Sequence, residues 1–148
     1  MPALWELCKD GNLVEVRAAL AQGGNVNYKG YGGLTALMWA VLESHNSIVK
    51  LLLDQPGVKV NEKNNFYGLT ALHFAAMCNN PEGARLLLLH PGFNSANGTT
   101  NSGDTALMYA VKYRKKEFLV ELVKHDSVSL DIPIYRIEIL LEGVLYGR

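Results

Sequence analysis

The sequence has only two cysteines, Cys8 and Cys78, and they lie far apart in the chain. A disulfide framework or a zinc knuckle needs more cysteines at closer spacing. We therefore expect both to be reduced thiols that pack as small apolar side chains. Reduced thiols are typical of the cytoplasm, with the nucleus as the other compartment that fits.

Net charge is also absent, because 14 acidic side chains balance 14 lysines and arginines. Attraction to nucleic acid or to anionic lipid requires clustered basic charge, so we expect neither nucleic acid nor a membrane as a partner. The apolar runs are only a few residues long, whereas a membrane-spanning helix needs about 20 apolar residues. The N-terminus lacks the basic start and long apolar stretch of a signal peptide.

Reactive constellations are missing as well. None of the four histidines has an Asp, Cys or second His at metal-ligand spacing. There is no G-x-S-x-G motif, and the glycine-rich run 30–33 lacks the strand before it and the G-K-[ST] ending of a phosphate loop. A turn explains that run better. We expect no enzymatic activity, no metal site and no cofactor.

What the sequence does contain is a motif that occurs three times. Gly-x-Thr-Ala-Leu begins at Gly33, Gly68 and Gly103, with 35 residues between successive copies. A fixed period of this size is typical of a stacked array of repeats. The glycine permits a turn conformation that other residues resist, and the threonine is a good helix N-cap.

This motif resembles the ankyrin repeat, whose signature is T-P-L-H-x-A with a period near 33 residues. The resemblance covers about residues 1–130. Alanine stands at positions 36, 71 and 106, where the family usually has proline, and only His73 keeps the histidine. In the family that histidine and the threonine help to tie the turn to the next repeat. The resemblance therefore implies this role for Thr70 with His73 alone.

The predicted fold is an all-α ankyrin-repeat solenoid of helix-turn-helix units joined by hairpin-like loops. We expect one domain over residues 1–148, with about four repeats, the first acting as an N-terminal cap, and a divergent C-terminal helix or partial repeat. The repeats are expected at about 1–29, 30–64, 65–99 and 100–131, followed by 132–148. Helix pairs are expected at 2–9 and 13–22, at 35 onward and 47–54, at 70–78 and 81–89, and at 105–113 and 117–124.

The repeat pattern fails after Asp126, because Glu138 and Leu140 stand where the motif needs Gly and Thr. Apolar residues at helical spacing nevertheless predict one helix over about 133–145. One interpretation is a divergent cap packed on the last repeat. Another is that its apolar outer side docks a second chain, which would give a homodimer through residues 132–148. A piece of a longer array would have the same pattern.

A basic cluster spans the turn between the helices of the last clear repeat, at Lys112, Arg114, Lys115 and Lys116. It fits either a solvated surface or a contact for an acidic peptide or a phosphate group.

In the ankyrin family the hairpin tips and the exposed side of each first helix form a groove that binds proteins. The resemblance thus implies a non-catalytic module for a protein or peptide partner; the alternative is a self-associating structural unit. Phe66 and Tyr67 are the strongest candidates, since aromatics are frequent at binding hot spots, although they could instead pack on the neighbouring hairpin. The matching positions are Tyr31, Leu34, Leu42, Glu43, Phe66, Tyr67, Leu69, Met77, Cys78, Asn101, Asp104, Lys112 and Tyr113.

Overall fold

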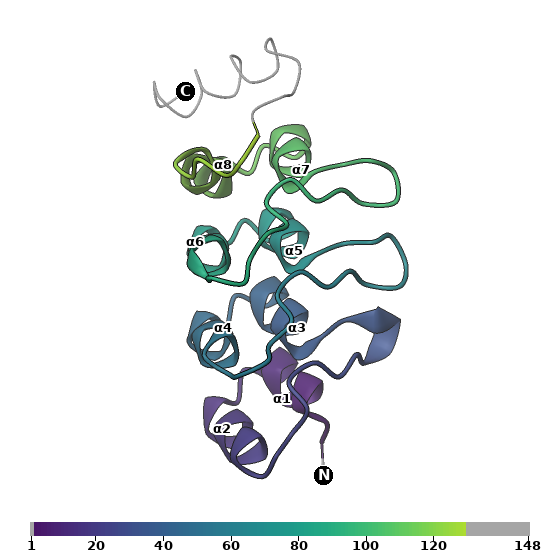
Figure 1. Ribbon diagram of the computed structural model, residues 1–148, viewed down its shortest axis with the longest axis vertical. Coiled ribbons are helices and arrows are strands. Elements are labelled where there is room, and N and C mark those ends of the chain that lie inside the picture. Colours follow the sequence, from purple (N-terminus) through teal and green to yellow (C-terminus); the bar gives the residue numbers. More distant parts are fainter. Residues whose placement is uncertain (1, 130–148) are drawn as a thin grey trace.

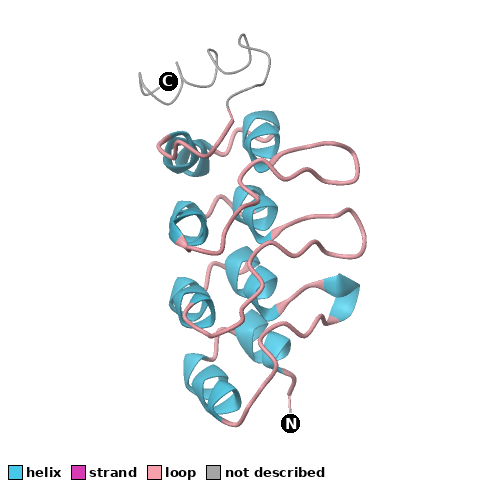
Figure 2. Ribbon diagram, viewed as in Figure 1, coloured by secondary structure: helices cyan, strands magenta, loops and turns pink. Residues whose placement is uncertain are grey.

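The computed structural model describes residues 2–129, and within them eight α-helices form four antiparallel pairs. Figure 2 shows only helices and loops over this range, as the all-α solenoid prediction requires. The helix bounds fall within two residues of the predicted ones, and the expected helix at 133–145 lies outside the described residues. The helices are α1 (Leu4–Asp10), α2 (Leu13–Ala21), α3 (Ala36–Leu42), α4 (Asn46–Leu53), α5 (Ala71–Met77), α6 (Pro81–Leu89), α7 (Ala106–Lys112) and α8 (Lys116–Val123).

The pairs stack into two parallel columns of helices (Figure 1). The first helices α1, α3, α5 and α7 pack one on the next, and the second helices α2, α4, α6 and α8 do the same. Long loops leave the column of first helices on the side away from the second helices. This arrangement leaves each repeat in contact mainly with its neighbours, as in other solenoids.

Threonine starts the first helix of each motif-bearing repeat, because its side chain accepts a hydrogen bond from a backbone N–H that no helical carbonyl can satisfy. Thr35, Thr70 and Thr105 have extended backbone conformations and occupy the N-cap position. Their hydroxyls accept from the amides of Met38, His73 and Met108 at 3.2, 3.4 and 3.2 Å. The repeated threonine thus fixes where each repeat begins its helix pair.

The motif leucine forms the centre of the core. Leu37, Leu72 and Leu107 have 2, 0 and 2% of their surface exposed. Leu4, the equivalent residue of the first pair, is only half-buried, because among the described residues a neighbouring repeat covers α1 on one side alone. The period read from the sequence therefore corresponds to equivalent buried positions in successive layers.

His73 is fully buried and joins two repeats. Its Nδ1 accepts from the Thr70 amide at 3.2 Å, and its Nε2 donates to the backbone carbonyl of Asp104 at 2.8 Å. Thr70 Oγ1 also lies 2.8 Å from Nδ1. Met38 and Met108, at the same motif position, accept hydrogen bonds from the amides of their own cap threonines and form none to the next repeat among the described residues. The implied role of Thr70 with His73 is confirmed.

Because His73 is buried, we expect the folded protein to lose stability in acid. Burial lowers the pKa of His73 from its ordinary value of 6.5, with the charge of Lys63 acting in the same direction and the bond to Asp104 opposing it. The unfolded chain then binds the proton more readily, so the contribution of His73 to stability is complete above about pH 6.5 and is lost as the pH falls below it. Melting temperatures at pH 5 and pH 7.5 should differ more in the native protein than in His73→Gln. An equal acid loss in both proteins would exclude His73 as the cause.

Candidate interaction surface

Backbone hydrogen bonds fasten the hairpin tips to one another. The amide of Asn65 donates to the carbonyl of Gly32 at 3.1 Å, and the amide of Asn101 donates to the carbonyl of Tyr67 at 2.9 Å. The first hairpin also closes on itself through an antiparallel bridge between Lys29 and Thr35. The three tips therefore form a continuous edge along the array.

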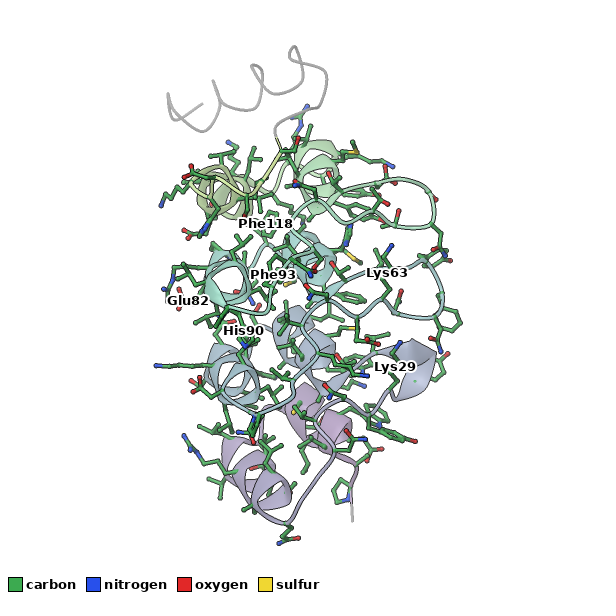
Figure 3. All side chains as sticks on the ribbon, viewed as in Figure 1. Lys29, Lys63, Glu82, His90, Phe93 and Phe118 are labelled. Atoms are coloured by element: carbon green, nitrogen blue, oxygen red, sulfur yellow. The ribbon has the colours of Figure 1, made fainter. Side chains whose placement is uncertain are left out.

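Two lysines at equivalent positions, before the tips, join each hairpin to the next. Lys29 Nζ donates to the carbonyl of Lys63 at 3.0 Å and lies 3.0 Å from the Glu62 carboxylate. Lys63 Nζ donates in turn to the carbonyl of Thr99 at 2.7 Å. Figure 3 shows the two lysines on successive hairpins. These two lysine side chains therefore stabilise the contact between successive hairpins, a role that the sequence did not indicate.

An asparagine recurs where each hairpin leaves the second helix, and its carboxamide holds the next connection through one donated and one accepted bond. The donor–acceptor distances are 2.6–3.0 Å, so all six are short hydrogen bonds. Side chains and tips together make the hairpin face a rigid surface. The pairs are Asn27 with Gly57 and Lys59, Asn61 with Gly92 and Asn94, and Asn97 with Ser127 and Ser129.

The aromatic side chains on these tips remain largely exposed. Tyr31, Phe66 and Tyr67 have 75, 59 and 68% of their surface accessible to water. The rings of Tyr31 and Phe66 meet edge to face, with centroids 6.3 Å apart. Packing against a neighbouring hairpin thus occurs, as one interpretation expected, but it leaves most of each ring free for another molecule.

The exposed ends of the first helices provide the other side of the surface. Met77 and Tyr113 are 40 and 52% exposed, whereas Leu42 and Cys78 are half-buried. Glu43 and Lys112 are exposed. The surface therefore changes along the array, from acidic at α3, through neutral at α5, to basic and aromatic at α7.

Two of the predicted surface residues belong to the core. Leu34 and Leu69 are only 8 and 6% exposed, so the prediction that they line the groove is wrong. Each directly precedes a cap threonine, and its backbone carbonyl accepts the hydrogen bond that closes the hairpin. The amide of Gly30 donates to the carbonyl of Leu34, and the amide of Asn64 donates to that of Leu69. Closure turns these side chains inward. Asp104 takes the equivalent place in the fourth repeat and is half-buried, while Asn101 is exposed.

Sequence reasoning missed two aromatic residues on the first helices. Trp39 stacks on Trp5 at 5.9 Å, with Lys9 Nζ 5.0 Å above its ring. Tyr109 lies 5.7 Å from the rings of both His73 and Tyr113. Both stand two residues after the motif leucine, so the repeat register itself could have identified them.

Neither thiol has the environment of a nucleophile. Burial raises the pKa of Cys8 to about 12. Burial also raises the pKa of Cys78, against the opposing effect of a hydrogen bond from Ser44. A reactive cysteine needs a lowered pKa. Within residues 2–129 there is likewise no group of three His, Cys, Asp or Glu side chains that could hold a metal ion.

The stacked helix pairs, the threonine caps and the bond from His73 to the next repeat agree with a comparison of the sequence with protein families. A model described as ankyrin repeats (3 copies) matches residues 1–64 and 57–133. The chain belongs to the ankyrin repeat family. Ankyrin repeats are generally protein–protein interaction modules. None of the helices in the described part of the chain is long and apolar enough to cross a membrane.

Curated relatives share a shorter stretch with this ankyrin-repeat chain. Osteoclast-stimulating factor 1 of Rattus norvegicus and of Mus musculus is 41% identical over 60 residues, and that of Bos taurus is 40% identical over 60 residues. The aligned stretch covers 40% of this chain and 28% of each relative.

Proposed function

We propose that this chain is a non-catalytic binding module for a protein or peptide partner, in the cytoplasm or the nucleus. The partner would lie along the hairpin tips and the exposed ends of the first helices. The single observation that carries the proposal is the exposure of Tyr31, Phe66 and Tyr67 on a backbone that hydrogen bonds hold in place.

Exposed aromatics on a rigid edge suit binding for two physical reasons. Each ring offers a large apolar area, and few torsions have to be ordered when a partner covers it. Because inter-hairpin bonds already fix the tips, little backbone entropy is lost on association. The family supports the same conclusion, since ankyrin repeats generally bind other proteins.

The proposal predicts that Phe66→Ala weakens partner binding about thirtyfold, which corresponds to roughly 2 kcal/mol for an aromatic hot spot. Tyr67→Ala should weaken it as well. A partner captured with the native protein, or a peptide selected on it, would be titrated against each variant by isothermal calorimetry.

Leu89→Ala provides the control. Leu89 on α6 is 61% exposed, close to the 59% of Phe66, but it belongs to the column of second helices, away from the tips. Its replacement should leave affinity unchanged. Equal affinity in the native protein and both tip variants would overturn the assignment of the surface.

A further inference from the structure

The end of α7 and the turn that follows it carry three cations that form no ion pair with an acidic side chain among the described residues. Lys112 and Arg114 are exposed, and Lys115 is half-buried. Within the described residues none of the three forms an ion pair or a side-chain hydrogen bond. We call Lys112, Arg114 and Lys115 the basic turn.

Two acids lie near the basic turn without forming an ion pair with it among the described residues. The Glu117 carboxylate accepts a hydrogen bond from Asn79 at 2.7 Å, which favours its charged form. The charge of Asp104 acts on the pKa of Tyr109 in the direction opposite to that of Lys112. Three cations against these two acids leave a net positive charge at the helix-turn end of the surface.

The basic turn adjoins two tyrosines of the last described repeat, Tyr113 and Tyr109. Lys112 Nζ lies 5.4 Å from the centre of the Tyr113 ring, which in turn contacts Tyr109. Lys115 lies close enough to Cys78 on the preceding repeat for its charge to lower the pKa of that thiol, while Glu43 acts on the same thiol in the opposite direction. A ligand that crosses these repeats would meet negative charge at α3 and positive charge at α7.

Arg114 stands in a conformation that favours glycine. Its φ is +55°, and the equivalent residues are Gly11, Ser44 and Asn79, all with positive φ. The side chains of Ser44 and Asn79 compensate through bonds to Cys78 and to Glu117 and Phe118. The Arg114 side chain makes no hydrogen bond or ion pair among the described residues. The positive φ is therefore shared by this turn in all four helix pairs, and Arg114 differs only in that its side chain is left for other contacts.

We infer that the partner is a peptide segment with a carboxylate side chain, and that this carboxylate binds the basic turn while apolar residues of the segment cover the aromatic tips. The inference rests on the proposed function and adds to it the charge of the bound peptide and the direction in which the peptide lies. Complementary charge selects the partner and its orientation more than it adds affinity. The Glu43 end would repel the same carboxylate, so the segment binds in one direction.

The test uses the whole chain and a displayed library of random peptides. Peptides selected on the native protein should be enriched in Asp or Glu together with apolar residues. The affinity of one such peptide would then be measured by fluorescence anisotropy. Arg114→Gly should raise the melting temperature, because it relieves the positive φ, and should yet weaken binding about three- to fivefold, the effect of one exposed ionic contact.

Reversing two charges gives the larger effect and a matched control. Lys112→Glu with Lys115→Glu should weaken binding at least about tenfold and reduce its salt dependence. Arg17→Glu with Lys50→Glu changes the net charge equally on α2 and α4, where both residues are exposed, and should leave binding unchanged.

The outcomes separate this inference from the proposed function. If Phe66→Ala weakens peptide binding but the reversed basic turn does not, the carboxylate contact is wrong and the proposed function stands. If no selected peptide is sensitive to Phe66→Ala, the proposed function falls and the inference falls with it. The native protein could instead bind vesicles of equal parts phosphatidylcholine and phosphatidylserine. If reversing the basic turn abolishes vesicle binding but leaves peptide binding unchanged, the ligand of the basic turn is a membrane and the inference is overturned.

Discussion

Phe118→Ala should lower the free energy of unfolding by about 3–5 kcal/mol, the usual cost of truncating a fully buried phenylalanine. Phe118 on α8 has none of its surface exposed (labelled in Figure 3), and its amide is held by the Asn79 side chain of the preceding repeat at 3.0 Å. The substitution removes apolar contacts and leaves a cavity between two repeats. Urea unfolding followed by circular dichroism would measure the loss.

The damage should stay local. Because helices pack mainly on their neighbours, the amides of α7 and α8 should lose hydrogen-exchange protection while those of α1 to α4 keep theirs. Val14→Ala is the control, since Val14 is 77% exposed and surface substitutions usually change stability by less than about 0.5 kcal/mol. If amides along the whole array lost hydrogen-exchange protection equally, the repeats could not be weakly coupled layers.

Gly33→Ala should cost about 3 kcal/mol, from two effects that add. Gly33 has a φ of +73°, a conformation that costs a residue with a side chain roughly 1–2 kcal/mol. An added Cβ would also overlap the Asn65 carboxamide and come within 2.7 Å of the Asn65 backbone nitrogen. Asn65 would have to move, although its amide bonds to Gly32 and joins the first two tips. Chemical denaturation of both proteins would measure the difference.

Gly57→Ala separates the two effects. Gly57 has a nearly equal φ of +76°, but apart from its two chain neighbours no described residue has an atom within 4 Å of the position that a Cβ would take. It should cost only about 1 kcal/mol, since the backbone strain remains while the overlap is absent. Similar losses for the two alanine variants would show that contact between hairpins contributes nothing at Gly33.

Local rules explain which parts of the fold the sequence predicted. Thr35, Thr70 and Thr105 act on amides three residues away, so their effect on the helix start is visible in the sequence. The role of His73 required the family resemblance, because its second partner, Asp104, lies in the next repeat. The exposure of Phe66 and Tyr67 agrees with their choice as surface residues, whereas their binding role remains a proposal.

The errors and omissions share one origin. Leu34 and Leu69 adjoin exposed tips in the sequence, but closure of each hairpin turns them into the core. The repeat register marks the positions of Trp39 and Tyr109, but their contacts with Trp5 and His73 on other helices depend on the tertiary structure. The homodimer through residues 132–148 stays a prediction, since those residues lie outside the described part.

The sequence alone determined the period, the helix pairs and the core leucines, because hydrogen-bond caps and helical periodicity act over a few residues and recur in register. Only the tertiary structure decided which side chains face outward. Exposure depends on how one hairpin or helix lies against the next, across about 35 residues of chain. Phe66 and Leu69 belong to the same hairpin, yet the first is exposed and the second is buried.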